Sequence, residues 1–175
     1  MEHTVLFSAE TIQEVVGRLA ARIDTSDVDS FVVVSVLKGA AIFSSDLIRR
    51  METDTELVYI TASSYLKDFT PSDALEVNQE TELGVQDRHV LIVEDIIDTG
   101  RTLKAIAATV AKEGPRSVST VALINKTNRR TTDFEPNFTG IDITDEFIYG
   151  YGLDWNQKYR DLPYIAIANP DTAST

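Results

Sequence analysis

The stretch His89–Thr102, HVLIVEDIIDTGRT, decides the fold of this 175-residue chain. It opens with the apolar, mostly β-branched run 90–93, which is typical of a strand buried on both faces of a parallel sheet. Two carboxylates follow, Glu94 and Asp95, and after two isoleucines comes the polar segment 98–102. Apolar residues then recur at helical spacing. The stretch therefore predicts a strand, an acidic tip, a tight polar loop and the start of a helix.

The polar loop offers the groups that bind a phosphate: backbone N–H groups, two threonine hydroxyls and a helix N-terminus. A glycine lets the backbone approach a ligand without a Cβ. The acid pair would repel a phosphate, so we expect it to face ribose hydroxyls or Mg²⁺. A ribose 5-phosphate fits better than a free phosphate, although an acidic strand end with a simple helix cap is the alternative. The predicted ribose- and phosphate-binding residues are Glu94, Asp95, Asp98, Thr99, Gly100, Arg101 and Thr102.

Composition narrows the class of protein. A hydrophobic content of 43% suits a single domain over residues 1–175 with a sizeable core. No apolar run approaches the ~20 residues of a membrane span, the N-terminus lacks a signal-peptide pattern, and there is no cysteine. We therefore expect a cytoplasmic protein. The net charge of −12 disfavours nucleic-acid and anionic-membrane partners.

Further runs predict the rest of the core. Ser8 is expected to cap a helix whose apolar face includes 12, 15, 16, 19, 20 and 23. Strands are expected at 31–37, 56–62 and 118–124, and a helix at 40–51. Ligands gather at the carboxyl ends of parallel strands, which makes Lys38-Gly39 and the cations within 126–130 candidate ligand-binding groups. A plain strand-to-helix turn and a solvated turn are the alternatives.

The string VLIVEDIIDTGRTL resembles the phosphoribosyl-diphosphate motif of the type I phosphoribosyltransferases, most closely the hypoxanthine-guanine group. The resemblance extends from Phe31 to Ile165. It implies an α/β fold with a central parallel sheet flanked by helices. It also implies a small hood subdomain, formed by the N-terminal segment and about residues 137–170, and a lid loop over about 64–87.

The same resemblance implies roles for individual residues. Pyrophosphate would be bound by Lys38, Gly39, Ser64, Tyr65 and Arg160, with a cis peptide before Lys38. The purine would be bound by Ile96, Lys126, Phe147, Ile148 and Asp154. Lys126 has only donors, so it would accept a 6-oxo group and reject an amino group. The metal ligands would be Glu94, Asp95 and Asp154.

The implied reaction transfers phosphoribosyl from 5-phosphoribosyl 1-diphosphate to hypoxanthine, guanine or xanthine, with Mg²⁺ as cofactor. The products would be IMP or GMP and pyrophosphate, Asp98 would be the general base, and relatives form homodimers or homotetramers. The chain departs from its relatives at Ser72 and Leu75 in the lid and at Asn125 and Thr127 beside Lys126. The alternatives are an RNA-binding regulator with this fold and a transferase for another base.

Overall fold

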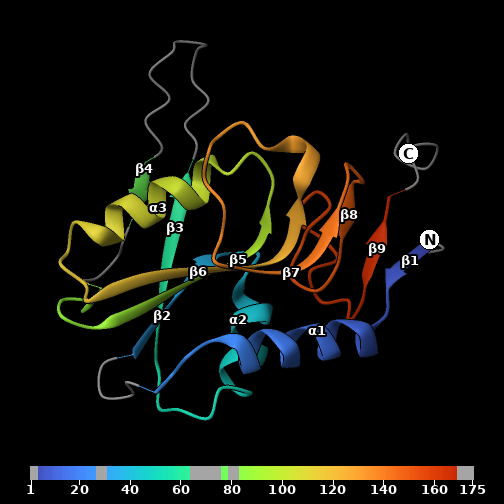
Figure 1. Ribbon diagram of the computed structural model, residues 1–175. Helices are drawn as coiled ribbons and strands as arrows, with labels where there is room; N and C mark the ends of the chain where they lie inside the picture. Colours follow the sequence, from blue (N-terminus) through green and yellow to red (C-terminus); the bar gives the residue numbers. More distant parts are fainter. Residues whose placement is uncertain (1–3, 27–30, 64–75, 79–82, 169–175) are drawn as a thin grey trace.

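A six-stranded sheet with β5 near its centre organises the computed structural model, which describes residues 4–26, 31–63, 76–78 and 83–168 (Figure 1). Its strands are β2 (Phe31–Leu37), β3 (Glu56–Ser63), β4 (Glu76–Asn78), β5 (His89–Ile97), β6 (Ser117–Lys126) and β7 (Phe138–Ile143). The order is β4-β3-β2-β5-β6-β7. All neighbours pair in parallel except β4, which runs antiparallel to β3. The predicted α/β fold is confirmed.

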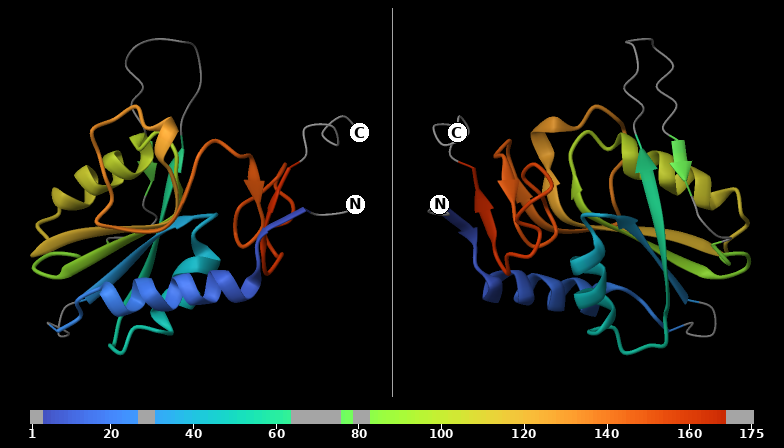
Figure 2. Two further views of the ribbon diagram at one scale, coloured as in Figure 1. Left: turned by 45° about the vertical axis from the view of Figure 1, so that its right-hand side comes forward. Right: turned by 180° about the vertical axis from the view of Figure 1, so that it is seen from behind.

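Helices cover both faces of this sheet. They are α1 (Ala9–Arg22), α2 (Ala41–Ile48) and α3 (Arg101–Ala111). Figures 1 and 2 show α1 and α2 on one face and α3 on the other. The predicted cap of α1 is confirmed, because the Ser8 hydroxyl accepts a hydrogen bond from the backbone N–H of Thr11 at 3.2 Å. α2 is shorter than predicted, since the chain turns at Arg49.

Side-chain alternation in the central strands builds two separate cores. Val33 and Leu91 pack in the cluster that contains the buried face of α1 and α2. Val32 and Ile92 point the other way and pack with Leu103 and the rest of the buried face of α3. Because both faces are covered, β2 and β5 are apolar along most of their length, as their sequences predict. None of the helices in the described ranges is both long and apolar enough to span a membrane.

A second, three-stranded sheet forms the hood from both ends of the chain. Its strands are β1 (Thr4–Phe7), β8 (Ile148–Tyr149) and β9 (Ile165–Ile167), in the order β1-β9-β8. The predicted hood range of about 137–170 also includes β7, which pairs with β6 in the central sheet. The hood is tied to α2 by the Tyr151 hydroxyl, which donates to the Asp46 carboxylate at 2.7 Å.

The predicted lid lies largely outside the described residues, and so do Ser64 and Tyr65. Two described parts of the range 64–87 belong to the body of the protein. Residues 76–78 are β4, and Leu83 and Val85 are buried in the core beside α3. The predicted lid over about 64–87 stays a prediction for the rest of its range.

Close packing of α1 on β7 gives a first prediction. A Cβ at Gly140 would lie 2.6 Å from the carbonyl oxygen of Leu123 and 2.8 Å from Val15 Cγ1. We expect Gly140→Ala to lower the free energy of unfolding by about 1–3 kcal/mol in a urea titration, because overpacking strains both neighbours.

Gly17→Ala is the matched control within α1. A Cβ at Gly17 meets only the flexible side chain of Arg50, at 3.6 Å. Alanine is also the better helix former by about 1 kcal/mol, so this variant should be as stable as the wild type or more so. Equal destabilisation by both substitutions would contradict the packing described for Gly140.

Candidate active site

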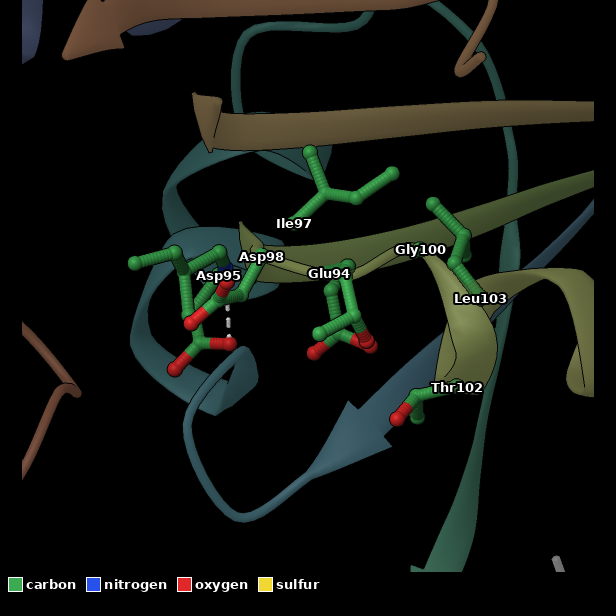
Figure 3. A pocket seen from close by; sticks show the side chains of 9 residues that line it. Glu94, Asp95, Ile97, Asp98, Gly100, Thr102 and Leu103 are labelled. Carbon is green, nitrogen blue, oxygen red and sulfur yellow. Dashed lines mark hydrogen bonds between the residues drawn. The ribbon is translucent and has the colours of Figure 1, made fainter. Parts of the chain in front are cut away.

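A cleft of about 170 Å³ opens where β5 ends and α3 begins. It is lined by Glu94, Asp95, Ile96, Ile97, Asp98, Thr99, Gly100, Thr102 and Leu103. Figure 3 shows the carboxylates of Glu94 and Asp95 on one side of β5, with the side chain of Ile97 directed to the other. Almost all the predicted ribose- and phosphate-binding residues therefore line one cavity. Arg101, at the start of α3, is exposed.

The acid pair at the end of β5 is buried, with Glu94 and Asp95 only 7% and 8% exposed. Burial raises the pKa of Glu94 well above its usual range, and the neighbouring Asp95 carboxylate raises it further. Burial also raises the pKa of Asp95. Hydrogen bonds, including one from the backbone N–H of Ile96 at 2.8 Å, and the charge of Arg160 oppose that rise. Two adjacent buried carboxylates of this kind favour a cationic or hydroxyl-bearing ligand.

The loop predicted to bind phosphate is held in place by the segment at residues 131–132. Gly100 adopts a left-handed conformation with φ +83°, and a Cβ there would lie 2.5 Å from the Thr132 hydroxyl. The backbone N–H of Thr131 donates to the Thr99 carbonyl at 3.1 Å, and the Thr132 hydroxyl donates to the same carbonyl at 3.2 Å. The loop thus keeps its backbone close to the segment behind it, and α3 starts directly after Gly100.

The loop after β2 meets the acid pair directly. The peptide bond between Leu37 and Lys38 is cis, as the resemblance implies. A Cβ at Gly39 would overlap the carboxylate of Asp95, and a Cβ at Gly152, in the hood, would overlap the carbonyl of Gly39. Glycine is therefore required at both positions, and the predicted pyrophosphate loop lies between the acid pair and the hood.

Lys126 ends β6, next to the end of β5, and the residue is only 8% exposed. Within the described part of the chain, no side chain forms a hydrogen bond or ion pair with its ammonium group. A largely buried cation that has no side-chain partner among the described residues could take a ligand as its partner. This location suits the predicted role of Lys126 in binding the base.

The hood supplies an exposed aromatic ring. Phe147 is 54% exposed and packs edge-on against Trp155, with ring centroids 6.2 Å apart. Its neighbour Ile148 is buried in β8. Tyr149 is also buried and packs on Trp155 and Tyr159. A small aromatic cluster thus holds the exposed ring of Phe147, and Ile96 lines the cleft at the end of β5.

Arg160 and Asp154 pair with each other in the hood. Arg160 Nη2 lies 2.6 Å from Asp154 Oδ1, and Nη1 donates to the Gly152 carbonyl at 2.7 Å. Asp154 also accepts a hydrogen bond from the backbone N–H of Gln157 at 2.9 Å. No group of three or more potential metal-ligating side chains occurs among the residues the structure describes. Asp154 is therefore not gathered with Glu94 and Asp95 into a preformed metal cage.

Two arginines of the basic segment after β6 contact Asp98, a contact that the sequence analysis does not predict. Arg129 Nε lies 3.2 Å from Asp98 Oδ1, and Arg130 Nη1 donates to the Asp98 carbonyl at 2.9 Å. Arg130 also donates to Asn125, whose amide donates in turn to Asp142 at 2.8 Å. The signal that could have revealed these contacts is the adjacency of β5 and β6, which brings their ends together.

This sheet, hood and cleft define a phosphoribosyl-binding fold, and known proteins match it. The sequence model of the family "Phosphoribosyl transferase domain" matches residues 6–156 of this chain. The hypoxanthine-guanine phosphoribosyltransferase of Staphylococcus aureus is 37% identical over 172 residues, covering 97% of this chain and 96% of that protein. The Bacillus subtilis enzyme of the same name is 36% identical, with 95% and 93% covered.

Solved structures agree with the sequence comparisons. The hypoxanthine phosphoribosyltransferase of Staphylococcus aureus has a TM-score of 0.87 and 38% identity, over 98% of this chain and 94% of that one. The Trypanosoma cruzi enzyme has a TM-score of 0.90 at 32% identity, with the same coverage. The chain belongs to the phosphoribosyltransferases and, within them, to the hypoxanthine-guanine phosphoribosyltransferase family.

The raised pKa values of the acid pair predict a pH-dependent stability. A carboxyl whose pKa is higher in the folded than in the unfolded state contributes stability below its unfolded pKa, and loses it as the pH rises through its folded pKa. Glu94→Gln cannot ionise, so its melting temperature should exceed that of the wild type at pH 8. The difference should shrink towards pH 4, where Glu94 is protonated in both states.

Glu52→Gln is the control, since Glu52 is an exposed carboxylate outside the cleft. In differential scanning calorimetry, its melting temperature should equal that of the wild type across the same pH range. A Glu94→Gln variant that is less stable than the wild type at pH 8 would contradict the repulsion within the acid pair.

Proposed function

We propose that the protein transfers the phosphoribosyl group of 5-phosphoribosyl 1-diphosphate to a 6-oxopurine in Mg²⁺-dependent purine salvage. The observation that supports this proposal is that three neighbouring parallel strands end at the same edge of the sheet, beside the cleft. β5 supplies the acid pair, Asp98 and the phosphate loop, β2 supplies Lys38-Gly39, and β6 supplies Lys126. The similar enzymes named hypoxanthine-guanine phosphoribosyltransferase support the choice of base.

Different residues would bind the phosphate, the ribose and the diphosphate of the substrate. The 5-phosphate would bind the backbone N–H groups of 99–102 at the start of α3. Glu94 and Asp95 would hold the ribose side, and Lys38, Gly39 and Arg160 would hold the diphosphate. The bond from C1 of ribose to the diphosphate oxygen breaks and a bond from C1 to a purine nitrogen forms. Pyrophosphate leaves with the electron pair, and Asp98 takes the proton from the purine nitrogen.

The donor set fits Mg²⁺ of the kind that binds through few carboxylates and several substrate oxygens. Glu94 and Asp95 are hard oxygen ligands at the end of β5, buried and mutually repulsive, so a divalent ion would relieve their charge. Asp154 would complete the set from the hood. When bound, the ion would neutralise charge on the diphosphate.

We also propose that the protein is cytoplasmic and forms a homodimer or homotetramer.

Base choice follows from Lys126 and the hood. An ammonium group donates and never accepts, so it binds a 6-oxo group and disfavours the 6-amino group of adenine. Phe147 offers an exposed ring for stacking. Hypoxanthine, guanine and xanthine share the 6-oxo group, so Lys126 alone does not separate them.

A substrate panel tests the proposal. Wild-type protein with 5-phosphoribosyl 1-diphosphate and Mg²⁺ should form nucleotide from hypoxanthine or guanine, and at least about tenfold less from adenine or uracil. Nucleotide formation is measured by chromatography. Turnover of uracil or adenine alone would show that the protein is a transferase for another base. No turnover with any base, together with RNA binding at low salt, would favour a regulator.

Lys126→Ala separates the base site from the phosphoribosyl site. We expect this variant to lose affinity for hypoxanthine by about tenfold or more, since a charged hydrogen bond contributes ~1.5–3 kcal/mol. Its affinity for 5-phosphoribosyl 1-diphosphate in calorimetry should stay within about threefold of the wild type. The opposite pattern would assign Lys126 to the phosphate side and remove the ground for 6-oxopurine selectivity.

A further inference from the structure

One guanidinium group bridges two carboxylates at the mouth of the cleft. Arg129 lies in the short 3₁₀ helix after β6 (Thr127–Arg129). Its Nε lies 3.2 Å from Asp98 Oδ1, and its Nη1 lies 3.2 Å from Asp145 Oδ1. Asp98 follows β5, and Asp145 precedes β8 by three residues, so three separate chain segments meet at this one side chain.

Arg129 and its neighbour hold Asp98 at two points. Arg129 binds Oδ1 of the carboxylate, while Arg130 donates to the backbone carbonyl at 2.9 Å. Among the described residues, Oδ2 of Asp98 has no hydrogen-bond donor. The carboxylate is therefore fixed through one oxygen, and the other remains available to accept a proton from a ligand.

The carboxylate of Asp145 explains how Arg129 can hold Asp98 in place although the arginine is exposed. The side chains of Arg129, Asp98 and Asp145 are 49%, 38% and 59% exposed. A single exposed ion pair barely offsets the entropy lost when so long a side chain is ordered. Contacts from different nitrogens of the planar guanidinium to two carboxylates fix its orientation better than either contact alone.

Asp145 also connects Arg129 to the segment of the hood that is proposed to bind the base. It lies two residues before Phe147, the exposed ring of the hood. Arg129 thus connects the segment that carries the stacking ring to the carboxylate proposed as general base. A shift of either segment would be transmitted to the other through this guanidinium.

We infer that Arg129 is a positioning residue for proton transfer, which holds Asp98 towards the base by anchoring it to Asp145. This inference rests on the proposed function of Asp98. Because reacting groups must be aligned to well under 1 Å, the loss of this anchor should lower turnover more than it affects substrate binding. It should change stability little, since all three side chains are substantially exposed.

Kinetics of a variant series test the inference. Arg129→Ala should lower kcat with hypoxanthine about tenfold, with KM for 5-phosphoribosyl 1-diphosphate and the melting temperature close to wild type. Arg129→Lys should be intermediate, since an ammonium cannot present two separate nitrogens. Asp145→Asn should lower kcat about threefold. The double variant Arg129→Ala/Asp145→Asn should be no slower than Arg129→Ala, because both changes break one unit.

Lys104→Ala is the matched control. Lys104 forms its ion pair with Asp133, in the loop that follows Arg130. Its removal breaks an exposed ion pair to the same loop and should leave kcat within about twofold of the wild type. A tenfold loss in this variant would show that the loop in general is sensitive, and would overturn a specific role for Arg129.

Asp98→Asn separates failure of the inference from failure of the proposed function. It should lower kcat at least ~10²-fold. If it does so while Arg129→Ala stays within twofold of the wild type, Arg129 is not a positioning residue and the proposed base stands. If Asp98→Asn itself retains wild-type turnover, the base assignment fails and the role of Arg129 fails with it. Independent, multiplicative losses from Arg129→Ala and Asp145→Asn would also overturn the anchor.

Discussion

The burial of two adjacent carboxylates at the end of β5 is the constraint on which the rest of the site depends. Glu94 and Asp95 are removed from water by strands on both sides, and their pKa values rise as a result. A fold keeps such a pair only where a ligand or neighbouring donors compensate the charge. The backbone N–H of Ile96 and the charge of Arg160 compensate Asp95 in part. The remaining demand for positive charge is what makes this cleft suitable for a cation-bridged anionic substrate.

The glycines around the cleft follow from the same constraint. Gly39 has no room for a Cβ against Asp95, and Gly152 has none against Gly39. The hood, the loop after β2 and the acid pair are therefore in direct contact, one behind the other. A side chain at Gly152 would push the hood away from the loop after β2, so backbone contact at this glycine helps to position the hood against the central sheet.

Much of this arrangement could be predicted from the sequence, because it depends on local signals. The apolar run 90–93, the acids that follow it and the glycine at position 100 predict a strand, a cleft and a helix start within fifteen residues. The cis peptide before Lys38 was implied by family resemblance and is confirmed. Each of these features depends on residues that are close together in the sequence, so a short residue pattern is enough to predict it.

Other features depend on contacts between distant segments. β7 is a half-buried edge strand with a glycine and alternating polarity, so it lacks the continuous apolar run of β5 and its residues were assigned to the hood. Arg129 and Arg130 look like part of a solvated turn until β6 pairs with β5 and places them beside Asp98. The role of Asp154 as a metal ligand, which the resemblance implies, stays a prediction; in the structure this carboxylate pairs with Arg160.

We propose that the acid pair works with a divalent cation that enters the cleft together with the substrate. The most direct test is the initial rate of nucleotide formation from hypoxanthine against Mg²⁺ concentration, with EDTA-treated protein as the starting point. We predict no turnover in EDTA, a rise to full rate on addition of Mg²⁺, and only weak Mg²⁺ binding by the free protein, because few carboxylates bind Mg²⁺ without substrate oxygens. Full turnover in EDTA would contradict the account.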